Sequence, residues 1–190
     1  MLQPQPTTIT EAEYLALDAE NDIKHEFVDG VVYAMVGASA AHNDLTVTLS
    51  AILYTALKGE PCKVAQGDMR VKAGNASDYF YPDLTIVCGE RDFVPDATIA
   101  TLTNPIVIIE VLSPSTELYD RTLKFQRYQM IDALQDYVLV AQDKARVECF
   151  SRGDDETWVL SQADGLAASI RLPSVDLTLK LAEIYEQIEF

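Results

Sequence analysis

Two strand-length apolar segments each carry one carboxylate, and this pairing limits the possible folds of the chain more than any other feature. The segment 79–87 holds Asp83 directly after Pro82, and the segment 106–112 holds Glu110 after an apolar run. A carboxylate inside a buried strand is costly unless a cation or hydrogen bonds compensate its charge. Two carboxylates on neighbouring strands would repel each other unless a divalent metal lay between them, and hard oxygen ligands are what Mg²⁺ prefers.

Each carboxylate also has an ordinary structural interpretation. Asp83 could cap a turn that follows Pro82, and Glu110 could form a structural ion pair with an arginine. The burial pattern alone therefore leaves two hypotheses open: a shared metal site, or two unrelated carboxylates that stabilise the fold.

Helical and strand-like periodicities alternate along the chain and predict a single α/β domain over 10–190, preceded by a flexible N-terminus over 1–9. Thr10 is placed to cap a first helix, and apolar residues at three- and four-residue steps predict a longer helix over 39–57. A mixed central β-sheet flanked by helices fits the order of the elements best. Further helices are expected over 115–131 and 179–188, a hairpin turn at Asp29-Gly30, and strands over 62–66, 69–72, 79–87, 106–112, 137–141, 146–150 and 157–161.

The charge balance narrows the classes of partner. The 190 residues include 30 acidic and 14 basic side chains, for a net charge of −16. Such a surface argues against a nonspecific nucleic-acid coat protein and against a membrane-surface binder, because both normally present basic faces. An enzyme that acts on nucleic acid through a small basic groove stays open. Basic residues slightly outnumber acidic ones over 58–72 and 117–127, where such a groove could form.

The cysteines and the N-terminal residues predict a cytoplasmic protein. Cys62, Cys88 and Cys149 are odd in number and lack metal-binding spacing, so we expect neither a disulfide framework nor a zinc site. The first residues lack the basic start and the apolar run of a signal peptide. No apolar stretch reaches the roughly 18 residues of a membrane-spanning helix. Glycine-rich nucleotide motifs and the GxSxG motif of hydrolases are also missing from the sequence.

The helix predicted after Glu110 contains a lysine, Lys124. Lys124 lies four residues after Asp120, and side chains at this spacing are neighbours on a helix. A solvated Asp120–Lys124 ion pair is the ordinary interpretation. A lysine beside two metal-binding carboxylates could instead orient an attacking water and offset charge in a phosphorane-like transition state.

Taken together, these residues resemble the Uma-type family of restriction endonucleases, which is placed in the PD-(D/E)XK nuclease superfamily. The resemblance covers about 8–161, and its most specific part is the run over 110–116. It is carried by Pro82-Asp83, the run Glu110-Val111-Leu112-Ser113-Pro114-Ser115-Thr116, Asp120, Lys124, the segment His25-Glu26-Phe27-Val28-Asp29-Gly30, and Ala41-His42-Asn43.

The resemblance implies a restriction-endonuclease-like core and DNA as the substrate. It implies Asp83 and Glu110 as ligands of Mg²⁺, with Mn²⁺ as a substitute, and the carbonyl of Val111 could add a ligand. The superfamily expects a lysine two residues after the glutamate, where this sequence has Leu112. Lys124 would supply that lysine from the following helix.

Two further residues match less specific positions of the family. Glu26 could be an additional acidic ligand or a water-positioning group, or an exposed glutamate at a strand edge. His42 could assist proton transfer, or it could be a capping or surface histidine near a helix N-terminus.

The rival hypothesis is a noncatalytic binding or assembly module that keeps the nuclease fold. A homodimer is a separate expectation, since nucleases that cut both strands often act as symmetric dimers and most soluble oligomers have twofold symmetry. Apolar residues at helical spacing in the C-terminal segment could form the dimer seam or could pack on the sheet. These residues are Leu181, Ile184, Tyr185 and Ile188.

Overall fold

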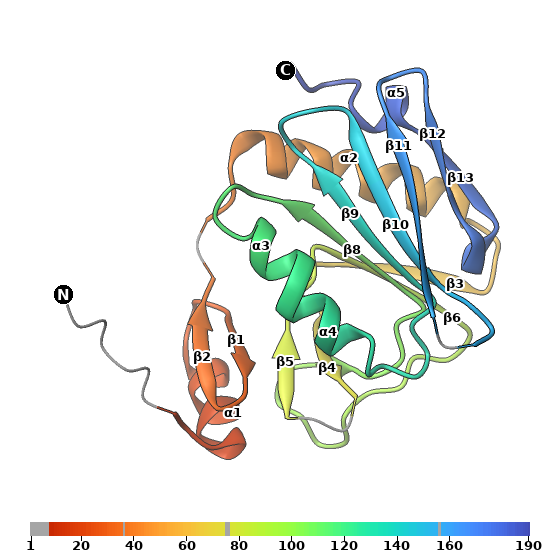
Figure 1. Cartoon of the computed structure of the whole chain (residues 1–190). Coiled ribbons are helices and arrows are strands. Elements are labelled where there is room, and N and C mark those ends of the chain that lie inside the picture. Colours follow the sequence, from red (N-terminus) through yellow and green to blue (C-terminus); the bar gives the residue numbers. More distant parts are fainter. Residues whose placement is uncertain (1–7, 36, 75–76, 156) are drawn as a thin grey trace.

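The centre of the molecule is a six-stranded mixed sheet (Figure 1). The structure is a computed structural model that describes residues 8–35, 37–74, 77–155 and 157–190. The strand order is β11-β10-β9-β8-β6-β3, in which β8 and β9 are parallel and the other neighbours are antiparallel. These strands are β3 (Cys62–Gln66), β6 (Leu84–Cys88), β8 (Val107–Leu112), β9 (Asp136–Ala141), β10 (Arg146–Arg152) and β11 (Trp158–Asp164).

Two smaller sheets complete the β structure. A five-stranded sheet has the order β2-β1-β5-β4-β7, and the last two strands of the chain form a separate hairpin. The strands are β1 (His25–Val28), β2 (Val31–Ala34), β4 (Arg70–Ala73), β5 (Asp78–Phe80), β7 (Thr101–Leu102), β12 (Ser169–Leu172) and β13 (Leu177–Lys180).

The two longer helices begin at residues whose side chains accept hydrogen bonds from the free N–H groups of the first turn. Thr10 and Glu13 form the expected capping box, and the Ser39 side chain caps the second helix at the predicted position. The helical segments are α1 (Glu11–Glu20), α2 (Ala40–Ala56), α3 (Glu117–Tyr119), the π-helical turn η1 (Asp120–Lys124), α4 (Phe125–Tyr128), the 3₁₀ turn η2 (Pro173–Val175) and α5 (Leu181–Ile184). Within the described ranges, no helix is both long and apolar enough to cross a membrane.

Helices cover both faces of the central sheet, and the alternation of side chains along β8 assigns each residue to one face. Ile109 and Val111 pack in the core cluster that contains the buried leucines of α2. Ile108 and Leu112 pack in the opposite cluster, which contains Tyr128 of α4. Because successive residues of a strand point to opposite faces, the carboxylate between Ile109 and Val111 points to the α4 side.

The expected hairpin turn is confirmed. Asp29 and Gly30 connect β1 to β2 with φ angles of 50° and 82°. Positive φ at both central residues is the requirement of a type I′ turn, which favours Asp-Gly. The Gly30 carbonyl also accepts a hydrogen bond from the N–H of Ile9 (2.8 Å). The expectation of a flexible N-terminus falls mostly on residues 1–7, outside the described residues.

The prediction of one strand over 79–87 is wrong. The segment forms two strands, β5 and β6, which belong to different sheets. Proline has no N–H to donate, so Pro82 cannot continue a strand ladder. Tyr81 donates its N–H to the Glu26 side chain rather than to a neighbouring strand (3.2 Å). The chain therefore changes sheet immediately before Asp83.

Two predicted helices also differ from the structure. The helix expected over 115–131 is three short segments that end at Tyr128, with the π-helical turn in the middle. The helix expected over 179–188 is only the short α5, because the residues before it belong to β13. Leu179 is buried between the exposed Thr178 and Lys180, and this alternation is the signature of a strand.

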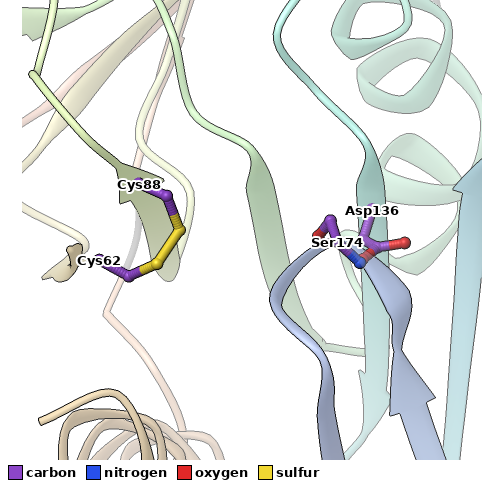
Figure 2. Close-up of a disulfide and its surroundings, with 4 residues drawn as sticks. All are labelled: Cys62, Cys88, Asp136 and Ser174. Atoms are coloured by element: carbon purple, nitrogen blue, oxygen red, sulfur yellow. Dashed lines mark hydrogen bonds between the residues drawn. A yellow bond between two sulfur atoms is a disulfide. The ribbon is translucent and has the colours of Figure 1, made fainter. Parts of the chain in front are cut away.

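The hairpin β12–β13 is fixed to the central sheet by a buried carboxylate. The N–H and the hydroxyl of Ser174 both donate to Asp136 Oδ2, at 3.0 and 2.5 Å (Figure 2). Leu181, Ile184 and Tyr185 are buried in the core behind this hairpin. The structure therefore excludes these three residues from a dimer seam.

The expectation that the cysteines form no disulfide is wrong as well. Cys62 and Cys88 form a disulfide between β3 and β6 (Figure 2). The two residues are directly opposite each other in the antiparallel register, although 26 positions separate them in the sequence. Spacing along the chain cannot reveal such a pair, because strand register brings it together. Cys149 is free and buried.

Candidate active site

A pocket of about 640 Å³ lies where Asp83, immediately before β6, and the last residues of β8 meet β1, β2 and the N-terminus of α2. The helical segment α3–η1 forms another wall of the pocket. All five side chains that the sequence singled out line it: Glu26, His42, Asp83, Glu110 and Lys124. The fold therefore brings together residues from four distant parts of the sequence.

Asp83 and Glu110 are neighbours at the end of the central sheet. Because β6 runs antiparallel to β8, the start of β6 lies beside the end of β8. The N–H of Asp83 lies 3.4 Å from Glu110 Oε2, and Asp83 Oδ2 accepts the N–H of Val111 at 2.7 Å. In a strand, the N–H and C=O of one residue point to the same side. The Val111 carbonyl therefore faces the side on which Asp83 lies.

Glu110 is almost completely buried, with 3% of its surface exposed. Its Oε1 accepts hydrogen bonds from Tyr128 (2.9 Å) and from Lys124 Nζ (3.1 Å). Burial raises the pKa of Glu110 well above its usual value, and the Lys124 charge opposes this rise. The neighbouring carboxylates of Asp120 and Asp83 raise the pKa further.

Lys124 is the cation at the centre of the cluster and is only 6% exposed. Its Nζ lies 2.9 Å from Glu26, 3.1 Å from Glu110 and 3.4 Å from Asp120. Burial lowers the pKa of Lys124, but the three carboxylates outweigh it, so the pKa stays well above its usual value. The side chain is therefore an ammonium at neutral pH, and the solvated Asp120–Lys124 pair expected from the sequence is buried instead.

Glu26 is buried rather than exposed at a strand edge. It reaches the cluster from β1, and its Oε1 accepts the N–H of Tyr81 in addition to the Lys124 contact. Since Tyr81 immediately precedes Pro82-Asp83, this hydrogen bond holds the chain at the point where it enters the pocket.

His42 faces Asp83 from the first turn of α2. Its Nε2 lies 3.2 Å from Asp83 Oδ2, and both side chains are partly exposed in the pocket. The hydrogen bond to Asp83 raises the pKa of His42, while burial opposes the rise. The protonated imidazole is therefore favoured next to the carboxylate, and a simple surface role for this histidine does not match its position.

Three further side chains contribute to the site: Asp120, which the sequence suggested only as the solvated partner of Lys124, and Tyr119 and Tyr128, which no sequence pattern indicated. Asp120 is buried and acts as a further carboxylate, and burial is the main cause that raises its pKa. Tyr128 donates to Glu110, and Tyr119 lies with its ring centroid 5.6 Å from Lys124 Nζ. The π-helical turn lies between Tyr119 and Tyr128 and contains Asp120. The spacing of apolar residues in the sequence does not predict such a turn.

The pocket contains oxygen donors of the type that a magnesium ion takes in proteins. No cluster of three or more His, Cys, Asp or Glu side chains with metal-binding geometry occurs in the parts of the chain that the structure describes. Magnesium commonly takes one or two carboxylates and completes its shell with water and substrate phosphate. Asp83, Glu110 and the Val111 carbonyl offer such a partial shell at the wall of an open pocket.

The architecture is shared with a solved structure. The chain superposes with a TM-score of 0.77 on a crystal structure from Anabaena variabilis ATCC 29413, described as a putative nuclease belonging to DUF820. The match covers 94% of this chain and 98% of the other, with 19% sequence identity. At that identity the likeness concerns the fold, and it confirms the predicted α/β class.

The chain belongs to the Uma2 family, whose description is "Putative restriction endonuclease". The family model matches residues 11–182 and confirms the resemblance seen in the sequence. Two uncharacterized proteins of Synechocystis sp. (strain ATCC 27184 / PCC 6803 / Kazusa) are also similar. The protein slr1290 is 33% identical over 178 residues, covering 94% of this chain and 92% of its own. The protein sll1609 is 36% identical over 162 residues, covering 85% and 91%.

Proposed function

We propose that the protein is a Mg²⁺-dependent endonuclease that hydrolyses phosphodiester bonds of DNA. The observation that carries this proposal is the contact between Lys124 and Glu110, beside Asp83 and within one pocket. Membership of the Uma2 family and the nuclease fold support the same reaction class.

The charges of the pocket support a divalent cation. Glu110, Glu26 and Asp120 surround the Lys124 ammonium, and Asp83 lies beside Glu110 and faces His42. Burial raises the pKa of Glu110, and the neighbouring carboxylates raise it further. A bound Mg²⁺ would compensate the excess charge, polarise a phosphoryl oxygen and lower the pKa of a bound water.

The residues of the chain would divide the remaining tasks. Asp83, Glu110 and the Val111 carbonyl would hold the metal. The Lys124 ammonium would orient the attacking water and stabilise negative charge on the phosphate oxygens in the transition state. His42, partly exposed beside Asp83, would give a proton to the leaving oxygen or take one from the water. Glu26 and Asp120 would position Lys124 through their ion pairs.

Cleavage of a supercoiled plasmid tests the proposal. We expect nicked or linear product with Mg²⁺ or Mn²⁺ and none with a chelator. Asp83→Ala should abolish cleavage, whereas Asp68→Ala is a matched control, because the Asp68 carboxylate is 92% exposed and pairs only with Lys24 among the described residues. Absence of cleavage for the native protein would favour the alternative of an inactive nuclease-fold module for binding or assembly.

A homodimer and a cytoplasmic location stay predictions. A twofold contact would have to use a surface other than the buried Leu181, Ile184 and Tyr185. Light scattering on the full chain measures the mass of the particle in solution and so distinguishes a monomer from a dimer. A reducing cytoplasm would disfavour the Cys62–Cys88 bond, so a thiol count on protein isolated with its thiols trapped bears on the location.

A further inference from the structure

Two tyrosines at the pocket have no part in the proposed hydrolysis. Tyr33 projects from β2 and is 41% exposed, and Tyr119 lies on α3 across from it. Their ring centroids are 5.6 Å apart, and both rings line the pocket. The ring of Tyr119 is itself held by the Lys124 ammonium, whose Nζ lies 5.6 Å from the ring centroid. The two rings therefore form an aromatic surface beside the carboxylates, in which Tyr119 supports Tyr33.

The cations near the pocket are already bound to carboxylates. Among the described residues that line it, Lys124 is the only lysine or arginine, and three carboxylates surround its Nζ. Nearby, Arg121 pairs with Glu117 and Glu148, and Arg127 pairs with Asp29 and Asp78. A protein needs many cationic side chains to bind duplex DNA tightly, because the duplex carries a phosphate charge about every 1.7 Å along its axis.

The depth of the site also disfavours a continuous duplex. Glu110 and Lys124, which line the pocket of about 640 Å³, are nearly inaccessible to solvent. A phosphodiester that reaches them must bring its own nucleoside into this pocket. A base that is paired and stacked in a duplex cannot follow, whereas an unpaired base can leave its stack and lie against an aromatic ring.

We propose that the pocket binds an unpaired nucleotide of single-stranded DNA, with its base stacked on the exposed face of Tyr33 and with Tyr119 bracing that ring. This inference rests on the proposed nuclease function and names its substrate class: single strands or unpaired ends rather than continuous duplex. Stacking would add affinity that the acidic chain does not gain from cations, since base–aromatic stacking contributes binding free energy for each stacked base and is tolerant of sequence.

The test compares a fluorescein-labelled single strand with the same strand in a duplex, measured by fluorescence anisotropy with Ca²⁺ in place of Mg²⁺. We expect tighter binding of the single strand. Tyr33→Leu should weaken it by about tenfold or more, the scale of one lost stacking contact. Tyr33→Trp should retain binding. Tyr54→Leu is the matched control, because Tyr54 is 68% exposed on α2 and lies outside this pocket.

The outcomes separate this inference from the nuclease function. Equal or tighter binding of duplex, no binding of either form, or no effect of Tyr33→Leu overturns the stacking site. In that case, Asp83-dependent cleavage of plasmid DNA would still support the endonuclease. Conversely, Tyr33-dependent binding of single strands without any cleavage in Mg²⁺ or Mn²⁺ would support the stacking site and remove the catalytic function.

Discussion

Two buried charge clusters meet at Tyr81, and they differ in how their charges are balanced. The hydroxyl of Tyr81 donates to Asp18 (2.6 Å), and its N–H donates to Glu26 of the pocket. On the Asp18 side, one carboxylate faces one guanidinium, that of Arg70 (2.9 Å). On the pocket side, the single ammonium of Lys124 faces several carboxylates.

The Asp18–Arg70 cluster has the properties of a structural ion pair. Arg70 is fully buried and also donates to Thr101 and to the carbonyl of Ile99. Asp18 accepts further hydrogen bonds from Tyr81 and from the N–H of His25. Every charge has its partner, and removal of one partner leaves an uncompensated buried charge.

Burial of a charged side chain is therefore not sufficient to identify a functional residue in this protein. Both clusters are equally hidden from solvent, but only the pocket cluster keeps an excess of negative charge and opens to a cavity. Perturbed carboxylates in a cleft are typical of functional sites. We therefore expect mutations in the first cluster to change stability and mutations in the second to change metal binding and catalysis.

The largest effect should come from Arg70→Met. Loss of the guanidinium leaves Asp18 buried without a counter-charge, which should lower the free energy of unfolding by about 3–5 kcal/mol. Urea denaturation measures this change. The matched control is Arg171→Met, because the Arg171–Asp176 pair is exposed and such pairs contribute about 0–1 kcal/mol. A loss below 1 kcal/mol for Arg70→Met would contradict the structural role.

Lys124→Met should reduce DNA cleavage by about 100-fold, the scale of one lost transition-state contact. The variant removes the cation that opposes the raised pKa values of Glu110 and Asp120, so these two carboxylates should take up protons in the folded state. A raised folded-state pKa gives stability that is present at low pH and is lost as the pH rises. The melting temperature of the variant, relative to the native protein, should therefore be lowest at high pH. Full cleavage activity in this variant would end the proposed mechanism.

A smaller effect of opposite sign is expected for Glu110→Gln. The raised pKa of Glu110 shows that its charged form is disfavoured by folding, so a neutral amide should stabilise the protein by roughly 0.5–2 kcal/mol. The gain should grow as the pH rises from the usual glutamate pKa toward the raised pKa of Glu110, because the variant has no carboxylate to ionise at this position. Cleavage should be lost at the same time. A destabilised variant at pH 9 would show that the charged carboxylate is needed for the fold.

The sequence predicts which residues meet in the pocket better than it predicts the path of the chain. Burial in apolar strands left a shared site for Asp83 and Glu110 as one of two hypotheses, and the family resemblance added Lys124 to it. The fold places both Asp83 and Lys124 within hydrogen-bond range of Glu110. The burial of Glu26 could not be predicted, since it depends on β1 packing against a residue 55 positions away. Likewise, only strand register reveals the Cys62–Cys88 pair.

Elements defined by local interactions were predicted well, and those that depend on tertiary contacts were not. The cap at Thr10 and the helix α2 follow from neighbouring residues, and both agree with the structure. The break between β5 and β6 was not predicted, because the residues on both sides of Pro82 favour strand and the effect of the proline was underestimated. The C-terminal strand β13 was missed because its alternation of buried and exposed residues covers only four residues and is followed by apolar residues at helical spacing.

The most direct test of the central claim is the melting temperature of the protein with and without Mn²⁺, beside Asp83→Ala and Glu110→Gln. If the two carboxylates share a divalent ion, Mn²⁺ at about ten times its dissociation constant should add roughly 1.4 kcal/mol of stability. For a domain of this size, that corresponds to a rise of about 3–6 °C. We expect the rise in the native protein and in Asp68→Ala, and its loss in Asp83→Ala and Glu110→Gln. An unchanged rise in both of the latter variants would contradict the account, because the ion would then bind elsewhere.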